Sequence, residues 1–366
     1  MSTELNFDTA FVSEQASKNL LELTDRYKKQ AHLSESNNTD APDSDFDRFD
    51  CDASQHLVSV IIPTHNRKHM LKEAVDSVLM QTNCGVEVII VDDCSSDGTP
   101  EFVKEQYGGL DNVHYFRNET SLGPGKARQK GYRASKGDYV TFLDDDDLYI
   151  EPSFFETAVK RHEFHKTCAF VCGNTFYFYQ NTASLKKHNL KHRGFIKGED
   201  YFNGFSISYK KPLSSFPSIF KRSVLDEADF TNMEMMNDAS IYLRAVCLGD
   251  VFIMDDYIGA YRVHGSNISK GIDLDFLIGN IDEKYNIYLF SKQFKRNAGD
   301  EWLRKQVGIS VRYYLAGNDK NKKSSRTLID WCKTHPDFKM EWMLKEILRS
   351  KLLPLKKKVY RILKRK

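Results

Sequence analysis

The sequence predicts an α/β fold with a largely parallel sheet. Runs rich in β-branched residues, each long enough for one buried strand, alternate with segments whose apolar residues recur at helical spacing. Repeated alternation of strand and helix is typical of parallel sheets with crossover helices. Polar clusters directly follow three of these strands, and ligands bind beyond the carboxyl ends of strands in such sheets. The same pattern therefore predicts where a binding site lies.

The alternation runs from residue 57 to residue 143. Two of its strands, LVSVIIP and VEVIIV, are almost continuously apolar, as buried parallel strands are. Pro100 suits the first turn of a helix, because no backbone N–H is needed there. In chain order the predicted elements are a strand over Leu57–Pro63, a helix over Arg67–Met80, a strand over Val86–Val91, a helix opening at Asp97–Thr99, a strand over Val113–Phe116, a helix over Gly125–Ala134 and a strand over Tyr139–Leu143.

Composition and length agree with a globular protein. The chain has 366 residues, a formal net charge of +2, 40% hydrophobic and 28% charged residues, which excludes a nucleic-acid coat as a whole-chain identity. No apolar run approaches the roughly 20 residues of a membrane-spanning helix. Residues 1–14 lack the basic start and apolar block of a secretory signal. Seven scattered cysteines without a CxxC pair predict reduced thiols in a cytosolic protein.

Charge is distributed unevenly along the chain. Residues 1–55 carry twelve acidic and five basic side chains, whereas residues 345–366 carry ten basic side chains and one acidic. Within the acidic part, residues 34–52 are rich in Ser, Asn and Asp and predict a flexible linker. Residues 11–27 before it have helical apolar spacing and predict a small surface or docking helix.

The three polar clusters at the strand ends are Pro63–Arg67, Asp92–Thr99 and Asp144–Asp147. Because the carboxyl ends of neighbouring parallel strands meet at one edge, we expect these clusters to converge. Four consecutive carboxylates repel one another unless a cation or pairing relieves them. Hard divalent cations such as Mg²⁺ and Mn²⁺ prefer oxygen ligands. The alternative is a solvated acidic turn without a metal.

Three segments together resemble a known family. VSVIIPTHNR, VEVIIVDDCSSDGT and LGPGKARQKGYRASKGDYVTFLDDDD are similar, in this order, to the successive motifs of the family 2 glycosyltransferases. The likeness is good over about residues 57–150 and less even to about residue 270. It implies the GT-A fold, a Rossmann-like, mostly parallel mixed sheet flanked by helices, here with helical N- and C-terminal extensions. Gly123–Lys126 (GPGK) is not a P-loop, since Thr120 stands where the first glycine belongs and Ala127 where Ser or Thr belongs.

The resemblance implies a nucleotide-sugar site and a metal site. Asp92 or Asp93 would hold the base, most often uracil in this family, and Asp145 would face the ribose or the sugar. Asp144 and Asp146 would form the DxD pair that binds Mn²⁺ or Mg²⁺. His264, within Tyr261–Asn267, would ligate the metal or bind phosphate in an element that often closes over the diphosphate. The other implied nucleotide-sugar-binding residues are Pro63, Thr64, Asn66, Arg67, Lys126, Arg128 and Asp144.

The resemblance also implies the catalytic base. In the family an ED dipeptide precedes a helix, and its Asp removes the proton of the acceptor hydroxyl; Asp238 matches that position and Arg244 the arginine of the helix. Asn237 stands where the family has Glu. Glu234 is the fallback base. The alternative is that Asp238 only caps a helix, since Asp is preferred at that position.

The division of the chain follows from these features. Residues 1–55 would be an acidic extension, residues 56–275 the catalytic domain, residues 276–340 a helical region and residues 341–366 a basic amphipathic tail. Within the catalytic domain, residues 56–150 would bind the nucleotide sugar and residues 151–275 would form the acceptor side. The tail interleaves apolar and basic residues, which favours an anionic membrane surface over nucleic acid as its partner. We therefore expect a cytoplasmic protein, peripheral on the inner face of the membrane.

The predicted function is metal-dependent, inverting transfer of a hexosyl or N-acetylhexosaminyl group. The donor would be a nucleotide-diphosphate sugar, most simply UDP-linked, and the acceptor a glycan or lipid-linked hydroxyl in surface polysaccharide or glycolipid synthesis. A retaining route would need a second carboxylate as nucleophile, and none can be placed. A sugar nucleotidyltransferase would need a Gly-rich basic loop after the first strand, which PTHNR does not supply. A sugar-nucleotide-binding scaffold without catalysis is favoured only by Asn237.

Overall fold

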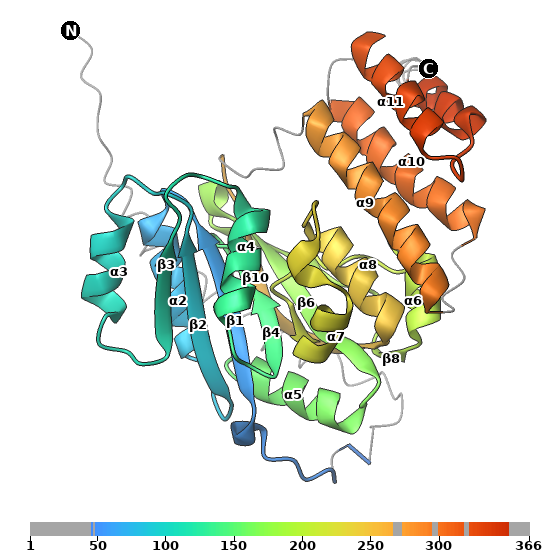
Figure 1. Cartoon of the computed structure of the whole chain (residues 1–366). Coiled ribbons are helices and arrows are strands. Elements are labelled where there is room, and N and C mark those ends of the chain that lie inside the picture. Colours follow the sequence, from blue (N-terminus) through green and yellow to red (C-terminus); the bar gives the residue numbers. More distant parts are fainter. Residues whose placement is uncertain (1–44, 47, 266–272, 295–298, 318–321, 351–366) are drawn as a thin grey trace, which may run out of the picture. The chain divides into compact units, whose positions relative to one another are not determined.

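The structure is a computed structural model that describes residues 45–46, 48–265, 273–294, 299–317 and 322–350 (Figure 1). The chain divides into two compact units. The first unit comprises the chain up to Asn232 together with Leu248–Gly265. The second unit comprises Met233–Cys247 and the chain from Ser266 onward. The predicted helix over residues 11–27 lies outside the described residues.

The first unit is built on one mixed sheet. In the described residues its strand order is β3-β2-β1-β4-β9-β6-β10-β5, with β7 paired to β6 and β8 to β10. The left half, β3-β2-β1-β4, is entirely parallel, and β9 runs antiparallel to both of its neighbours. The strands are β1 (Leu57–Thr64), β2 (Gly85–Asp92), β3 (Val113–Arg117), β4 (Tyr139–Phe142), β5 (Leu148–Tyr149), β6 (Cys168–Tyr179), β7 (Ser184–His188), β8 (Gly194–Ile196), β9 (Ser218–Lys221) and β10 (Asp250–Val263).

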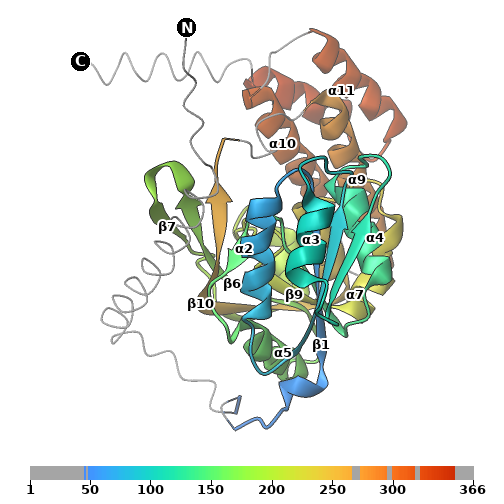
Figure 2. The same ribbon diagram turned by 90° about the vertical axis from the view of Figure 1, so that its left-hand side faces the viewer.

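Helices cover both faces of this sheet, and all seven elements predicted between residues 57 and 143 are present. The helices of the first unit are α2 (Lys68–Leu79), α3 (Thr99–Tyr107), α4 (Pro124–Ala134), α5 (Phe154–Phe164), α6 (Gly198–Gly204) and α7 (Arg222–Glu227). Side chains from α2, α3 and α5 form one core with alternate residues of β1 and β2, among them Val60 and Val88. The intervening residues of β1 and β2, among them Ile61 and Val91, contact α4 on the opposite face of the sheet (Figures 1 and 2). Gly131 permits this close approach, because a Cβ there would lie 2.5 Å from Cγ2 of Ile61.

The residues before β1 correct part of the linker prediction. Phe46 and Phe49 each pack edge-on against Phe164 of α5, with ring centroids 5.6 and 5.3 Å apart. The guanidinium of Arg161 lies 3.3 Å from the centre of the Phe46 ring. The end of the predicted flexible linker is therefore anchored to α5, because its two aromatic residues are buried more favourably against a helix than in water.

The second unit is helical, as predicted for the C-terminal region. Its elements are α8 (Asp238–Leu248), which ends at its border, α9 (Leu274–Gln293), α10 (Asp300–Gly317), α11 (Lys322–Thr334) and a helix over residues 340–350. Ion pairs join these helices: Arg244 of α8 binds Glu283 of α9 at 2.6 Å in a largely buried pair, and the partly exposed Arg312 of α10 binds the buried Glu346 at 2.7 Å. Trp331 of α11 stacks on His335, with centroids 4.1 Å apart.

The described part of the basic tail packs within the second unit. On the helix over residues 340–350, Met343 and Ile347 are buried, whereas Leu344 and Leu348 are 41% and 57% exposed. Residues 351–366, which carry most of the predicted amphipathic pattern, lie outside the described residues. Among the helices that the structure describes, none combines the length and the apolar character needed to cross a bilayer.

Candidate active site

The predicted convergence of the three polar clusters is confirmed. Because β1 lies between β2 and β4 and is parallel to both, their carboxyl ends form one edge. The hydroxyl of Thr64, at the end of β1, donates to Asp145 Oδ2 at 2.7 Å. The backbone N–H of Asp93, after β2, donates to the carbonyl of Thr64 at 2.8 Å. Residues 29 and 81 positions apart in the chain thus meet at one point.

Arginines hold the acidic loop that follows β4. One nitrogen of Arg67, Nη1, lies 3.0 Å from Asp145 Oδ1 and 2.9 Å from Asp146 Oδ2. Arg128 of α4 binds Asp144 at 2.5 Å, with only 7% of its side chain exposed. These contacts relieve the repulsion among neighbouring carboxylates that the sequence raised as a question. The arginines also place positive charge where an anionic substrate group would approach.

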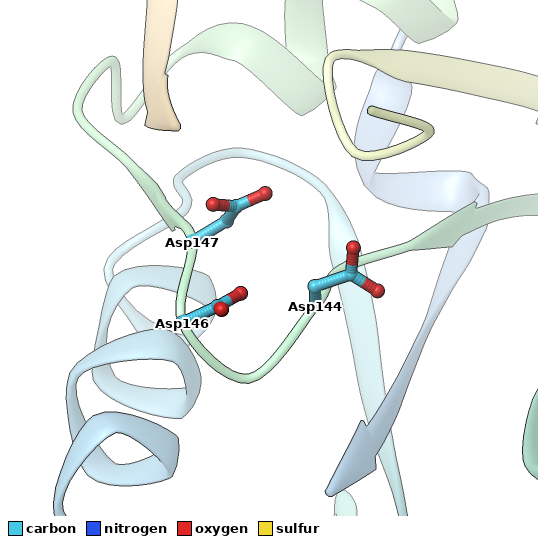
Figure 3. A group of neighbouring side chains, drawn as sticks. All are labelled: Asp144, Asp146 and Asp147. Carbon is cyan, nitrogen blue, oxygen red and sulfur yellow. The ribbon is translucent and has the colours of Figure 1, made fainter. Parts of the chain in front are cut away.

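Three carboxylates of this loop can share one cation. Asp144, Asp146 and Asp147 each offer an oxygen, and these oxygens all lie within 4.8 Å of one another (Figure 3). Asp147 is 1% exposed, and its Oδ2 has no hydrogen-bond partner in the described structure. An oxygen that is buried and unsatisfied is costly unless something binds it. The all-oxygen set fits a hard divalent cation such as Mg²⁺ or Mn²⁺. The sequence prediction assigned Asp144 and Asp146 to this site but not Asp147.

His264 reaches the same loop from the end of β10. Its Nε2 lies 2.8 Å from Asp146 Oδ2, and its side chain is 6% exposed. Although burial opposes ionisation, the hydrogen bond from His264 and the charge of Arg67 lower the pKa of Asp146. His264 therefore lies beside the cluster, as the resemblance implied, and supports the ionised state of its central carboxylate.

The two neighbours of Asp146 behave differently. Burial, followed by the charge of Asp146, raises the pKa of Asp145 to about 7. The same two causes raise the pKa of Asp147 well above its usual range, against the hydrogen bond from Arg262. Three adjacent carboxylates cannot all carry full charge in a buried loop. A bound cation would favour the ionised form of those that it contacts.

The acidic loop over residues 144–147 is also supported by an ion pair that the sequence did not indicate. Arg262 of β10 is 1% exposed; its guanidinium binds the carboxylate of Glu73 on α2, and its Nε donates to the carbonyl of Asp146 at 2.9 Å. Its backbone N–H donates to Asp147 Oδ1 at 3.1 Å. The side chain of Arg262 therefore faces the protein interior. The expectation that the element around His264 closes over a diphosphate stays a prediction. Glu73 carried no signal in the sequence, because a lone Glu on a helix is usually solvated.

We expect removal of this arginine to destabilise the protein strongly. Arg262→Met leaves Glu73 and Asp147 buried without their cation, and breaking a buried pair typically costs about 3–5 kcal/mol. The urea denaturation midpoint measures the loss. Glu73→Gln combined with Arg262→Met should recover part of it, because the stranded charge is gone. Lys104→Met, at an exposed position of α3, is the control and should change little; an equally stable Arg262→Met protein would contradict the account.

The two candidate base-binding carboxylates are engaged inside the protein. Asp92 is fully buried and accepts from the Tyr115 hydroxyl at 2.5 Å and from the Ser95 N–H at 2.8 Å. Asp93 accepts bonds from both side chains and backbone of the loop before α4, whose donors are Asn118, Ser121, Leu122 and Gly123. These bonds lower the pKa of Asp93 despite its burial. Either carboxylate would have to exchange one of these donors for a base N–H, so the predicted contact stays a prediction.

The remaining predicted donor-site residues lie at the same edge. Pro63 is buried in β1. Asn66 adopts a positive φ of 55°, which Asn tolerates, and its side-chain oxygen accepts from the Ser96 N–H at 2.7 Å. Lys126 is exposed on the first turn of α4, which Gly123 begins with a φ of 84°. Asn66 therefore ties the two loops together, while Lys126 is open to a ligand.

Asp238 belongs to the second unit, and its role as base stays a prediction. It is the first residue of α8 and is half-buried. The cap of this helix is Asn237, whose Oδ1 accepts from the Ser240 N–H at 3.1 Å while the Ser240 hydroxyl accepts from the Asn237 N–H at 3.0 Å. The alternative that Asp238 itself caps the helix is therefore wrong. Asn is among the best capping residues, which gives a structural reason for Asn at the position where the resemblance expects Glu.

The sequence and the fold resemble those of known proteins. Residues 59–227 match the family model described as Glycosyl transferase family 2. The matched segment belongs to glycosyltransferase family 2. The structure of residues 1–349 of S. aureus TarS in complex with UDP-GlcNAc superimposes with a TM-score of 0.59, at 16% identity, covering 80% of this chain and 88% of that one. This likeness confirms the predicted GT-A fold.

Curated relatives share the same region. The GalNAc(5)-diNAcBac-PP-undecaprenol beta-1,3-glucosyltransferase of Campylobacter jejuni is 30% identical over 193 residues, which are 51% of this chain and 59% of that enzyme. Glycosyltransferase GlyA of Streptococcus pneumoniae is 25% identical over 221 residues, 58% of this chain and 31% of GlyA. The chain therefore spans less than two thirds of the length of these two relatives.

Proposed function

We propose that this protein is a family 2 glycosyltransferase that moves a sugar from a UDP-linked donor to a hydroxyl of a glycan or lipid-linked acceptor. The observation that carries the proposal is the strand-end cluster, in which three carboxylates able to share a cation lie among Arg67, Arg128 and His264. Such a set of charges suits a diphosphate bridged to a hard cation. The TarS complex, a protein of the same fold, holds UDP-GlcNAc, which supports a UDP-sugar as donor.

The chemistry assigned to the chain's own residues follows from charge. Asp144, Asp146 and Asp147 would hold Mn²⁺ or Mg²⁺, which when bound stabilises the negative charge of the departing diphosphate. Lys126 on the first turn of α4 would meet the phosphates, where the helix N-terminus also favours anions. Asp238 would take the proton of the acceptor hydroxyl as it attacks the anomeric carbon. One displacement from the opposite face inverts the configuration.

The first experiment is calorimetric titration of the purified protein with UDP, GDP and dTDP, each with Mn²⁺ and with EDTA. We expect UDP to bind in the presence of Mn²⁺ and to lose most of its affinity in EDTA, because carboxylates without a cation repel a diphosphate. Tight binding of GDP or dTDP instead would change the donor class. Equal binding in EDTA would contradict the metal site, and absence of binding to any nucleotide would favour the scaffold alternative.

We also propose that the enzyme works on the inner surface of the membrane through its basic tail. The Campylobacter relative is named for an acceptor attached to undecaprenol through a diphosphate, which supports a lipid-linked acceptor. Residues 351–366 carry eight basic side chains and no acidic one, and each basic residue contributes about 1 kcal/mol on an anionic surface.

Truncation after Ser350 tests this role of the tail. The cut leaves in place every described residue of the second unit, including the buried Met343 and Ile347. We expect the truncated protein to lose salt-sensitive binding to liposomes that contain anionic lipid, as measured by sedimentation, and to bind UDP as before. Liposomes of neutral lipid are the control and should bind neither protein. Unchanged binding to anionic liposomes would refute the membrane role.

A further inference from the structure

A second group of aromatic and basic side chains lies outside the strand-end site, at the β6–β7 hairpin and the end of β10. We call it the hairpin face and define it as Tyr177, Tyr179, Tyr261, Lys186 and Lys210. The register pairs Tyr177 with Tyr261 on one side and with Lys186 on the other. Directly paired residues project from the same face of a sheet. The ring of Tyr177 lies 6.2 Å from that of Tyr179 and 6.1 Å from that of Tyr261.

The hairpin face ends close to the acidic cluster in the chain. Tyr179 pairs with Val263, and the next residue, His264, lies 2.8 Å from Asp146 Oδ2. Figure 2 shows the β6–β7 hairpin beside the end of β10. The neighbouring residues of opposite parity, Phe178 and Arg262, are buried on the other side of the sheet. By the alternation of the strand, His264 shares the side of Arg262, so the hairpin face and the acidic cluster lie on opposite sides of β10 and meet at its end. A molecule that contacts both would pass around that end, within the first unit.

The charge around this face is strongly positive. Residues 186–211 contain seven Lys and Arg and only two acidic residues. Two of the cations are near carboxylates, Arg193 at 3.6 Å from Asp255 and Lys197 at 4.0 Å from Asp250. Among the described residues, Lys186, Lys191 and Lys210 have no carboxylate within 4.0 Å. Burial, followed by the charges of Lys210 and Lys211, lowers the pKa of the neighbouring His188 to about 4, which agrees with an uncompensated positive field.

The face is held in place before any partner arrives. The buried side chain of Asn174 donates to the carbonyl of Asp255 and accepts from the N–H of Leu190, both at 2.8 Å. The ammonium of Lys210 donates to the carbonyl of Asn189 at 2.8 Å, which brings it to the end of β7. Because these bonds order the loop in the free protein, a partner pays little to organise it.

We infer that the hairpin face binds the acceptor, and that the acceptor is a glycan carrying anionic groups, phosphate or carboxylate. Tyrosine rings offer flat apolar surfaces on which sugar rings stack, with a hydroxyl for hydrogen bonding at the edge. The lysines without a carboxylate partner supply the charge-assisted bonds that anionic substituents accept. A lipid surface would instead require protruding apolar side chains, whereas all three tyrosines are only half exposed. This inference rests on the proposed function and names its acceptor class.

Dextrans of one length and three charges test the inference: neutral dextran, dextran phosphate and carboxymethyl dextran. We expect the wild-type protein to bind one or both charged dextrans about tenfold or more tightly than neutral dextran at low salt. Lys186→Ala combined with Lys210→Ala should abolish most of that preference. Lys104→Ala combined with Lys136→Ala, at exposed lysines elsewhere on the first unit, is the matched control and should preserve it. Tyr179→Ala should weaken binding of all three dextrans.

Two readouts keep the outcomes distinct. Calorimetry with UDP and Mn²⁺ should be the same for the wild type and both lysine pairs. The inference fails and the proposed function stands if UDP binds but the wild-type protein binds the three dextrans equally. The same holds if UDP binds but the Lys186→Ala and Lys210→Ala double variant keeps the preference for charged dextrans. If the wild type binds no nucleotide, the proposed function itself fails. Loss of binding to anionic vesicles with unchanged dextran binding would assign the hairpin face to a lipid surface and overturn the inference.

Discussion

The Asp146→Asn variant is expected to lose metal-dependent UDP binding and to lower the rate of sugar transfer by about 10²–10³-fold. Asp146 is the carboxylate on which Arg67 and His264 converge, and its oxygen is one of the three that can share a cation. The amide keeps the size of the side chain but removes the charge that a hard cation requires. Calorimetric titration with Mn²⁺ and UDP, followed by donor hydrolysis and transfer assays, measures both effects.

Two further variants calibrate that result. Asp147→Asn should lower Mn²⁺ affinity as well, since its buried Oδ2 has no partner in the described structure; a variant with unchanged affinity would show that Asp147 is structural. Asp111→Asn, at an exposed position before β3, is the matched control and should behave as the wild type. If Asp146→Asn retains metal-dependent UDP binding and donor hydrolysis, the assignment of the acidic loop as the metal site is wrong.

The Asp238→Asn variant is expected to bind UDP with Mn²⁺ as the wild type does and to transfer sugar about 10²–10⁴-fold more slowly. The amide cannot take the proton of the acceptor hydroxyl. Helix α8 should persist, because its cap is Asn237 and not Asp238. Transfer kinetics with a UDP-sugar and an acceptor, set beside calorimetry, separate the loss of chemistry from a loss of binding.

Glu234→Gln is the matched control for the base. Glu234 is exposed in the segment before α8 and was the fallback assignment, so the variant should keep near-normal turnover if Asp238 is the base. Normal turnover in Asp238→Asn would sink the assignment. Loss of turnover in Glu234→Gln alone would move the role to Glu234.

Local patterns predicted the parallel half of the sheet because its elements are short in sequence and strongly periodic. The strand over Leu57–Pro63 and the helix over Arg67–Met80 were expected within one or two residues of β1 and α2. The order of the polar clusters then predicted their meeting at one edge, since parallel neighbours must align their carboxyl ends. The prediction of a flexible linker over residues 34–52 was wrong at its C-terminal end. The prediction rested on the polar composition of the whole segment and gave no weight to Phe46 and Phe49, which pack on α5.

The sequence by itself determined the α/β class, the strand-end acidic cluster and the resemblance that led to the family. These follow from residues close together in the chain, whose spacing and composition limit what they can form. Only the tertiary structure decided which side chains support the cluster and which aromatic residues gather on the hairpin face. Glu73 and Arg262 meet across 189 positions, and Tyr177 meets Tyr261 only through the register of β6 and β10. Such pairs depend on how distant helices and strands pack and align, and periodicity within one segment carries no information about that arrangement.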